Sequence, residues 1–249
     1  MAKQKPNLQL QSVEPNITIQ PTNKLRVKLD DMEVIEPLTD NQRKFFDLYD
    51  DEYEFIGLFG SAGTGKTKIS LYKALEEVLD KDNPYKQVII VRSLVQTRDV
   101  GFLPGSLEEK QEIFELPYKQ ICESLFNRSD AYQRLKEQGV LKFISTTAIR
   151  GITIDDSVVI VDESANCNWS ELSAIITRVG IRTKIIFCGD VFQNDLKNKN
   201  EYSGLTKFIE VANKMPDFVK IQFTSDDIVR SDLVKQFIIA CEEKGYALV

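Results

Sequence analysis

Short apolar runs alternate with amphipathic stretches along most of the chain. The runs are rich in β-branched residues and apolar almost throughout, which is typical of strands that are buried on both faces of a parallel sheet. They lie at residues 54–59, 87–91, 141–145, 157–161, 184–188 and 218–223. The pattern therefore predicts six strands that belong mainly to a parallel sheet.

Helical patterns separate these strands. Apolar residues recur every three or four positions over about 66–80 and 169–179, and again from Val234 to Cys241. The stretch 99–139 is also helical in pattern, but Pro117 interrupts it, and we expect a helical insertion carried on the core. Alternating strands and helices predict a single-domain α/β fold, with a mainly parallel sheet flanked by helices.

The first part of the chain has no such pattern. Residues 1–24 are polar and rich in Gln, Asn and Pro, and they predict a disordered tail ahead of a domain at 25–249. A short hairpin around Asp30 and Asp31 is expected near the start of that domain. The chain start lacks the apolar core of a secretory signal, and no apolar run reaches about 18 residues. We therefore expect a cytoplasmic protein without a membrane span.

Composition narrows the chemistry. The 249 residues include no histidine, so His-based triads and His-ligated metals are excluded, and any metal would be a hard cation held by oxygen ligands. The net charge is −6, so contact with a nucleic acid would require a local patch of cations.

Residues 60–67 read GSAGTGKT, which fits the phosphate-loop pattern G-x-x-x-x-G-K-[ST] between a predicted strand and a predicted helix. Such a loop curls its backbone N–H groups around phosphate oxygens, and the helix N-terminus adds partial positive charge. Lys66 would reach the β- and γ-phosphates, and the Thr67 hydroxyl would ligate magnesium. A glycine-rich turn that matches by chance is the alternative. We predict that a nucleotide is bound by Gly60, Ser61, Ala62, Gly63, Thr64, Gly65, Lys66 and Thr67.

Two adjacent acids follow the predicted strand at 157–161. Asp162 would lie where a magnesium ion bound to Thr67 can contact it, and Glu163 could polarise a water for attack on the γ-phosphate. By themselves, two acids could equally be the solvated end of a buried strand. The phosphate loop upstream favours the interpretation as a metal ligand and a general base.

Two glutamines extend this pattern. Gln193 follows the strand that ends at Gly189, where an amide can hold the γ-phosphate or orient the attacking water. Gln42 begins an amphipathic helix upstream of Lys66, and its side-chain amide can both donate to and accept from the adenine edge. Both are therefore candidate nucleotide contacts.

Taken together, these residues resemble the PhoH family, the phosphate-starvation-inducible P-loop ATPases related to the RecA-like core of superfamily-one helicases. The resemblance runs from about Leu38 to Glu243. It includes GSAGTGKT, GFLPGSLEEK (101–110), IVDES (160–164), TRVG (177–180), IIFCGDVFQNDL (185–196) and DIVRSDLV (227–234). It implies ATP and Mg²⁺ as ligands and a strand order that puts the strand ending at Gly189 between the other two site strands. A phage-encoded member would fit so compact a chain, and would work in the host cytoplasm.

The chain departs from the family pattern at several positions. The family usually has D-E-A-Q-N after the apolar strand, whereas residues 162–166 read DESAN and lack the glutamine. It usually has R-G-R where this chain has Arg150, Gly151 and Ile152. The residues expected to contact the nucleotide are retained. The family residues that this chain lacks are at positions that could couple hydrolysis to a partner.

The related helicases complete their site with arginines from a second RecA-like domain, for which this chain has no room. We therefore expect a homo-oligomer, with a hexameric ring as the favoured form, in which a neighbouring subunit supplies an arginine to the γ-phosphate. Arg178 and Arg230 are the candidates, and Arg150 is a weaker third. Each could instead be a solvated side chain or part of a structural ion pair.

The leading functional hypothesis is a Mg-dependent ATPase coupled to remodelling of RNA or single-stranded nucleic acid, as in a helicase. The remodelling rests mainly on the resemblance. The cations that could line a groove are Lys110, Lys119, Arg128, Arg134 and Lys136. The alternative is a nucleotide-gated assembly or binding module without helicase activity. A small-molecule kinase is a third and weaker hypothesis.

Overall fold

The computed structural model describes residues 26–51, 53–94, 107–190 and 204–246, with only the backbone described for 107–110. The predicted tail at 1–24, the start of the predicted insertion at 99–106 and the candidate Gln193 lie outside the described residues. In the part of the chain that is described, no helix is both long enough and apolar enough to cross a membrane.

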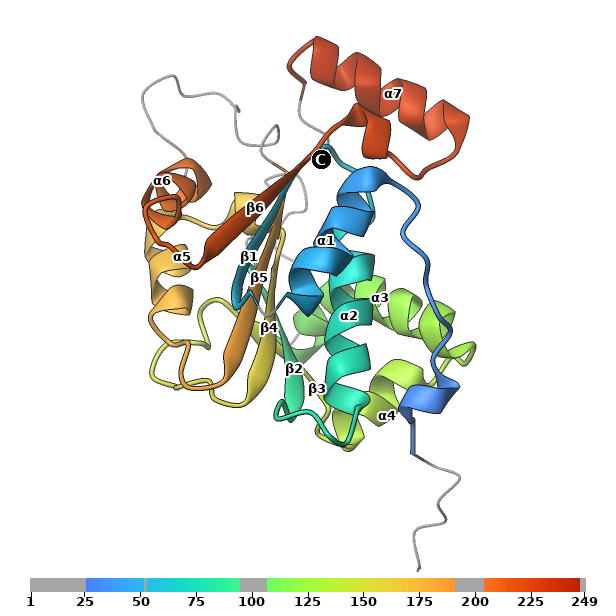
Figure 1. Cartoon of the computed structure of the whole chain (residues 1–249), viewed down its shortest axis with the longest axis vertical. Helices are drawn as coiled ribbons and strands as arrows, with labels where there is room; N and C mark the ends of the chain where they lie inside the picture. The colour runs from blue at the N-terminus through green and yellow to red at the C-terminus, as the bar shows by residue number, and fades with distance from the viewer. Residues whose placement is uncertain (1–25, 52, 95–106, 191–203, 247–249) are drawn as a thin grey trace, which may run out of the picture.

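Six parallel strands form one sheet in the order β3-β2-β4-β5-β1-β6 (Figure 1). Each predicted strand is confirmed to within one residue at either end. The β5 strand lies between β1 and β4, as the resemblance implied. The strands are β1 (Phe55–Gly60), β2 (Gln87–Arg92), β3 (Leu141–Ser145), β4 (Ser157–Asp162), β5 (Thr183–Gly189) and β6 (Phe218–Phe223).

The central strands owe their continuous apolar runs to their position. Every residue of β1, β4 and β5 is buried, because helices cover both faces of the sheet. Alternate residues enter two separate apolar cores. Ile56 and Ile160 contribute to one core, and Phe55 and Val159 contribute to the other.

Seven described helices surround the sheet (Figure 1). The first four cover one face, α5 and α6 cover the other, and α7 lies beyond the end of β6. They are α1 (Asp40–Asp50), α2 (Lys66–Leu79), α3 (Leu107–Phe126), α4 (Ala131–Glu137), α5 (Trp169–Ile176), α6 (Gly204–Ala212) and α7 (Asp232–Glu243). The prediction of an α/β sheet flanked by helices is thus confirmed.

Local expectations were less accurate. The hairpin expected around Asp30 and Asp31 is wrong, since Leu29–Asp31 forms a short 3-10 helix, η2, and no described strand begins there. The interruption expected at Pro117 is also wrong, because α3 continues through it. The α5 helix ends at Ile176, three residues before its predicted end.

The segment from Arg26 to Leu38 is a strap that crosses the outside of the helices before α1 begins (Figure 1). Its Val27 is buried in the core beneath these helices, and the Glu33 N–H donates to the Leu125 carbonyl of α3 at 2.7 Å. The strap thereby brings its last residues to the carboxyl end of the sheet, where the candidate site lies.

Candidate nucleotide-binding site

A cavity of about 610 Å³ opens at the carboxyl ends of β1, β4 and β5. Six parts of the chain line it: the phosphate loop with the start of α2, the ends of the central strands, one side of α3, the strap, the start of α1, and the segment between β6 and α7. In open parallel sheets, ligands bind at this edge. Among the lining residues are Leu38, Gln42, Lys66, Thr67, Arg92, Gln120, Asp162, Glu163, Asp190 and Arg230.

The phosphate loop has the backbone that its glycines predict. Gly60 has φ of +124°, and a Cβ there would lie 1.9 Å from the Phe223 carbonyl oxygen. Gly65 has φ of +81° and caps the N-terminus of α2. Positive φ values are strained for residues that carry a Cβ, so only glycine fits both places without displacement.

The Lys66 ammonium lies within this loop. Its Nζ donates to the carbonyl oxygens of Gly60 at 3.0 Å and Ser61 at 2.7 Å. Burial lowers the pKa of Lys66, and the negative charge of Asp190 acts in the opposite direction. A partly buried cation whose hydrogen-bond partners among the described residues are backbone carbonyls and a hydroxyl is suited to an incoming anion such as a phosphate.

Asp162 is held by hydroxyl groups on both of its carboxylate oxygens. The Thr67 hydroxyl donates to Oδ1 and the Tyr118 hydroxyl donates to Oδ2, each at 2.8 Å. No ion pair within 4.0 Å involves Asp162 in the described part of the chain. Hydrogen bonds from neutral hydroxyls orient this carboxylate without pairing it with a cation at hydrogen-bond distance.

The oxygens of Thr67 and Asp162 fit a magnesium ion. Among the described residues there is no group of three His, Cys, Asp or Glu side chains that could hold a metal. Magnesium, however, is commonly held by one or two protein oxygens together with the phosphates of its substrate. A hydroxyl and a carboxylate on one side of a phosphate loop are the ligands it prefers.

Glu163 lines the same cavity from an unusual backbone conformation. Its φ and ψ are 50° and 40°, in the left-handed region that residues with a Cβ rarely adopt, at a cost of about 1–2 kcal/mol. Burial, followed by the neighbouring charge of Asp162, raises the pKa of its carboxyl group. A carboxylate with a raised pKa is a better proton acceptor, which suits a general base.

Gln42 is buried against the phosphate loop. Its Nε2 donates to the Thr64 carbonyl at 2.9 Å, and its Oε1 accepts from the Leu38 N–H at 2.8 Å. An amide has two donor hydrogens and two acceptor lone pairs. One donor hydrogen and one acceptor lone pair of Gln42 are therefore left for a nucleotide base, and the edge of adenine offers the matching acceptor and donor.

The three candidate arginines occupy different places. Arg230 lines the cavity of its own chain, where its Cγ would lie 3.0 Å from a Cβ added at Gly63. Arg178 follows α5 at the amino end of the sheet, where its carbonyl accepts from the Ile154 N–H just before β4. Arg150 is exposed and donates to the Ser170 hydroxyl at 3.3 Å.

Ser164, one of the departures from the family pattern, has a structural contact. Its hydroxyl donates to the Cys188 carbonyl at 2.8 Å and so ties the turn after β4 to the end of β5. A Cβ added at Gly189 would lie 2.4 Å from the Ser164 hydroxyl oxygen. The serine therefore holds together two of the strand ends that line the cavity.

The sequence interpretation missed two side chains at the site. Arg92 ends β2 directly beside Asp162 in the sheet register, lines the cavity and lies 5.6 Å over the Phe114 ring. A cation at the carboxyl end of a predicted strand was a signal that could have identified it. Tyr118 had no such signal, because its role depends on how α3 packs over the sheet.

Comparison with solved structures gives distant similarities. The large terminase of a thermophilic bacteriophage in complex with ADP is 18% identical, with 81% of this chain and 49% of that chain covered and a TM-score of 0.47. The Pif1 helicase from Bacteroides in complex with ADP-AlF3 and ssDNA is 16% identical, with 77% and 42% covered and a TM-score of 0.38.

Comparison of sequences gives stronger similarities. The PhoH-like protein of Mycobacterium tuberculosis is 31% identical over 220 residues, which cover 86% of this chain and 60% of the relative. That of Bacillus subtilis is 33% identical over 187 residues, 75% and 57% of the two chains. The chain thus spans little more than half the length of these relatives. The family model described as PhoH-like protein matches residues 34–242, and the chain belongs to the PhoH family.

Proposed function

We propose that this protein binds ATP with Mg²⁺ and hydrolyses it to ADP and phosphate. The observation that carries the proposal is the arrangement around Asp162. Its carboxylate is hydrogen-bonded to Thr67 of the phosphate loop, and Glu163 and Lys66 line the same cavity. A small-molecule kinase would need basic groups that close over the phosphates, whereas Glu163 lines the cavity as an acid that can polarise a water.

The residues of the loop take separate roles in this proposal. The backbone of Gly60 to Thr67 cradles the phosphates, and Lys66 neutralises the charge on the β- and γ-phosphates. Thr67 and Asp162 would hold the magnesium ion, which would stabilise the negative charge that develops on the phosphates.

Glu163 removes a proton from the attacking water. The oxygen of that water bonds to the γ-phosphorus, and the bond between the γ-phosphorus and the oxygen of the leaving ADP breaks. Gln193 is proposed to orient that water, as the family resemblance suggests. Arg230 lines the cavity in its own chain, so its guanidinium is proposed to contact the phosphates in cis.

Gln42 is proposed to select adenine. The amide is oriented by the Leu38 N–H and the Thr64 carbonyl, so the free donor and acceptor have fixed directions. Guanine presents the reversed pattern of donor and acceptor at the corresponding edge, which a fixed amide would reject.

The site is proposed to be completed by a neighbouring subunit in a homo-oligomeric ring, most simply a hexamer. Arg178 lies at the opposite edge of the sheet from Lys66, so it could contact a γ-phosphate only in another copy. Its Nε is buried and makes no hydrogen bond within the described residues. The position of Arg178, away from the cavity of its own chain, is the observation that supports it as the arginine supplied in trans.

The proposal extends to coupling of hydrolysis to RNA or single-stranded nucleic acid, which rests on the family resemblance. Arg128 and Arg134 both pair with Asp130, and Lys136 pairs with Glu115. Three of the five cations expected to line a groove are thus already compensated by acids. This observation favours the alternative, a nucleotide-gated assembly or binding module without helicase activity.

A phosphate-release assay with ATP and Mg²⁺, with and without single-stranded RNA or DNA, tests the proposal beside a mass measurement at matched protein concentration. We expect hydrolysis, an oligomer, and stimulation by nucleic acid that weakens as salt rises. Hydrolysis without stimulation would favour the gated module. A protein that binds no ATP would contradict the proposal.

A further inference from the structure

We propose that Tyr118 is a positioning residue for the magnesium ligand Asp162, and that through it α3 controls how the site holds its metal. The inference rests on the proposed function, because it assumes that Thr67 and Asp162 hold Mg²⁺ with ATP. It assigns a role to a residue outside every motif of the phosphate site.

The contact itself is short and buried. The Tyr118 side chain has no exposed surface, and its hydroxyl donates to Asp162 Oδ2 at 2.8 Å. The other carboxylate oxygen, Oδ1, accepts from Thr67 at the same distance. The two hydroxyls hold the plane of the carboxylate, so Asp162 cannot rotate about its last bond without losing one of them.

A tyrosine does this without neutralising the acid. A lysine or arginine in its place would pair with Asp162 and compete with a divalent cation for the same charge. A neutral hydroxyl leaves the carboxylate negative and still fixes its direction. Partners of metal-binding side chains commonly act in this way, by orienting the ligand without touching the metal.

The position of Tyr118 on α3 links the direction of Asp162 to the shape of the nucleotide cavity. Neighbouring residues of the same helix, Pro117, Gln120 and Ser124, line the nucleotide cavity. Ser124 also accepts a hydrogen bond from Lys68 in the first turn of α2, at 3.4 Å. A shift of α3 would therefore change the shape of the cavity and the direction of Asp162 together.

Arg92 connects to the same contact. It ends β2 beside Asp162, lies over the Phe114 ring of α3, and interacts electrostatically with Tyr118 and both acids. The strand end, the helix and the metal ligand thus form one packed group, in which Tyr118 is the member that contacts Asp162 directly.

The test is the Tyr118→Phe variant, which removes the hydroxyl and keeps the ring. Tyr132→Phe is the matched control, because Tyr132 is also a buried tyrosine of the insertion but does not line the cavity. Binding of Mn²⁺ to the protein–ATP complex is measured by electron paramagnetic resonance, and ATP binding without metal is measured by calorimetry. The dependence of phosphate release on Mg²⁺ is measured in parallel.

We expect Tyr118→Phe to weaken Mn²⁺ binding and raise the half-saturating Mg²⁺ concentration about tenfold. ATP binding without metal should not change, and Tyr132→Phe should match the wild type in every measurement. A merely structural role would change thermal stability without changing the metal dependence.

A second measurement does not depend on the variant folding. With 3-fluorotyrosine placed at position 118 alone, the ¹⁹F resonance should shift when Mg²⁺ is added to the protein–ATP complex. An unchanged resonance, or an unchanged metal dependence in Tyr118→Phe with an active wild type, would overturn the inference alone. A wild type that binds no ATP would overturn the proposed function, and the inference with it.

Discussion

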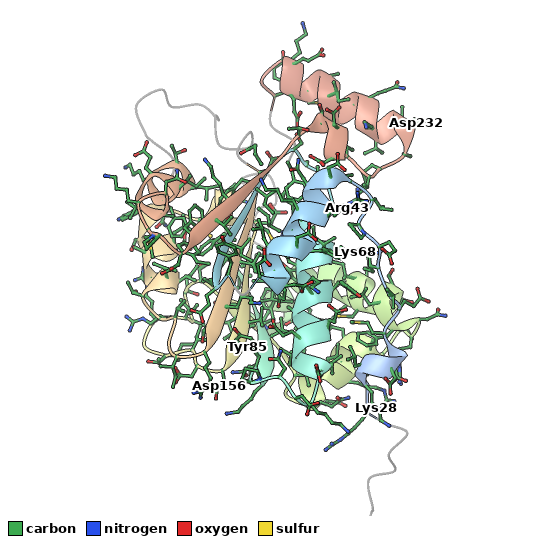
Figure 2. The ribbon with its side chains drawn as sticks, in the orientation of Figure 1. Lys28, Arg43, Lys68, Tyr85, Asp156 and Asp232 are labelled. Atoms are coloured by element: carbon green, nitrogen blue, oxygen red, sulfur yellow. The ribbon has the colours of Figure 1, made fainter. Side chains whose placement is uncertain are left out.

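Buried acids lie at both edges of the sheet, the amino edge where the strands begin and the carboxyl edge where they end, but the partners of these acids differ in charge. At the amino edge, Asp156 accepts from Lys86 and from Arg182, so two cations compensate one carboxylate. At the carboxyl edge, Asp162 accepts only from the hydroxyls of Thr67 and Tyr118 among the described residues. Figure 2 shows how far apart these two edges lie, since it labels Asp156 at the amino edge and Lys68, which follows Thr67 of the phosphate loop, well above it.

Backbone strain does not distinguish the two edges. Glu163 has φ of 50° at the carboxyl edge, and Asp156 and Arg182 have the same value at the amino edge. What differs is the kind of hydrogen-bond partner: Asp156 accepts from two cations, whereas Asp162 accepts from two neutral hydroxyls, which leave its carboxylate available to a metal. An acid held by neutral donors is therefore a better sign of a binding site than an acid in a strained backbone conformation.

The largest expected effect is at Lys66. In Lys66→Ala, ATP binding should fall below detection in calorimetry, because the phosphates lose the only lysine within the loop. Lys86→Ala is the matched control at the amino edge, where the lysine pairs with Asp156, and it should bind ATP as the wild type does. Normal ATP binding by Lys66→Ala would remove the distinction between the edges.

The next effect is at Glu163. Glu163→Gln should bind ATP but release phosphate about a thousandfold more slowly, because an amide cannot accept the proton of the attacking water. The control is Asp156→Asn, which loses its ion pairs and should lower the midpoint of thermal unfolding with little change in turnover. Normal turnover in Glu163→Gln would sink the general-base assignment.

Arg178 tests whether the amino edge takes part in a neighbour's site. Arg178→Ala should retain ATP binding and lose about a hundredfold in turnover, because the developing charge loses one donor. Mixing it with Lys66→Ala subunits should restore part of the activity, since some interfaces then combine an intact loop with an intact arginine. Arg182→Ala, which removes the arginine paired with Asp156, is the control. The absence of any recovery on mixing would argue against action in trans.

The smallest expected effect concerns recognition of the adenine base of the nucleotide by Gln42. Gln42→Ala should reduce the preference for ATP over GTP about tenfold in competition binding, as expected for the loss of one or two hydrogen bonds. The control is Asn41→Ala, since the neighbouring amide contacts Asp227 and the Gln222 carbonyl and does not line the cavity. Equal loss of preference in both variants would indicate a general effect of loosening α1.

Some elements could be predicted because their cause is local. The runs that became β1, β4 and β5 are continuous because every residue in them is buried, so their bounds were readable to within one residue. The hairpin expected around Asp30 failed because adjacent acids suit a 3-10 turn as well as a hairpin turn. The α6 helix was missed because most of its packing is against α5 and the 3-10 helix at Ser164–Asn166, which a pattern within nine residues cannot specify.

The sequence by itself determined where the phosphate-loop pattern and the acid pair lie, because each is a run of adjacent residues that follows an apolar strand. Only the tertiary structure decided how these residues are held. The partners of Asp162 are 95 and 44 positions away, at Thr67 and Tyr118, and meet it only because parallel strands end at one edge beneath α3. The same packing separates the two arginines, because Arg230 lies at the carboxyl edge of the sheet beside the cavity and Arg178 lies at the amino edge.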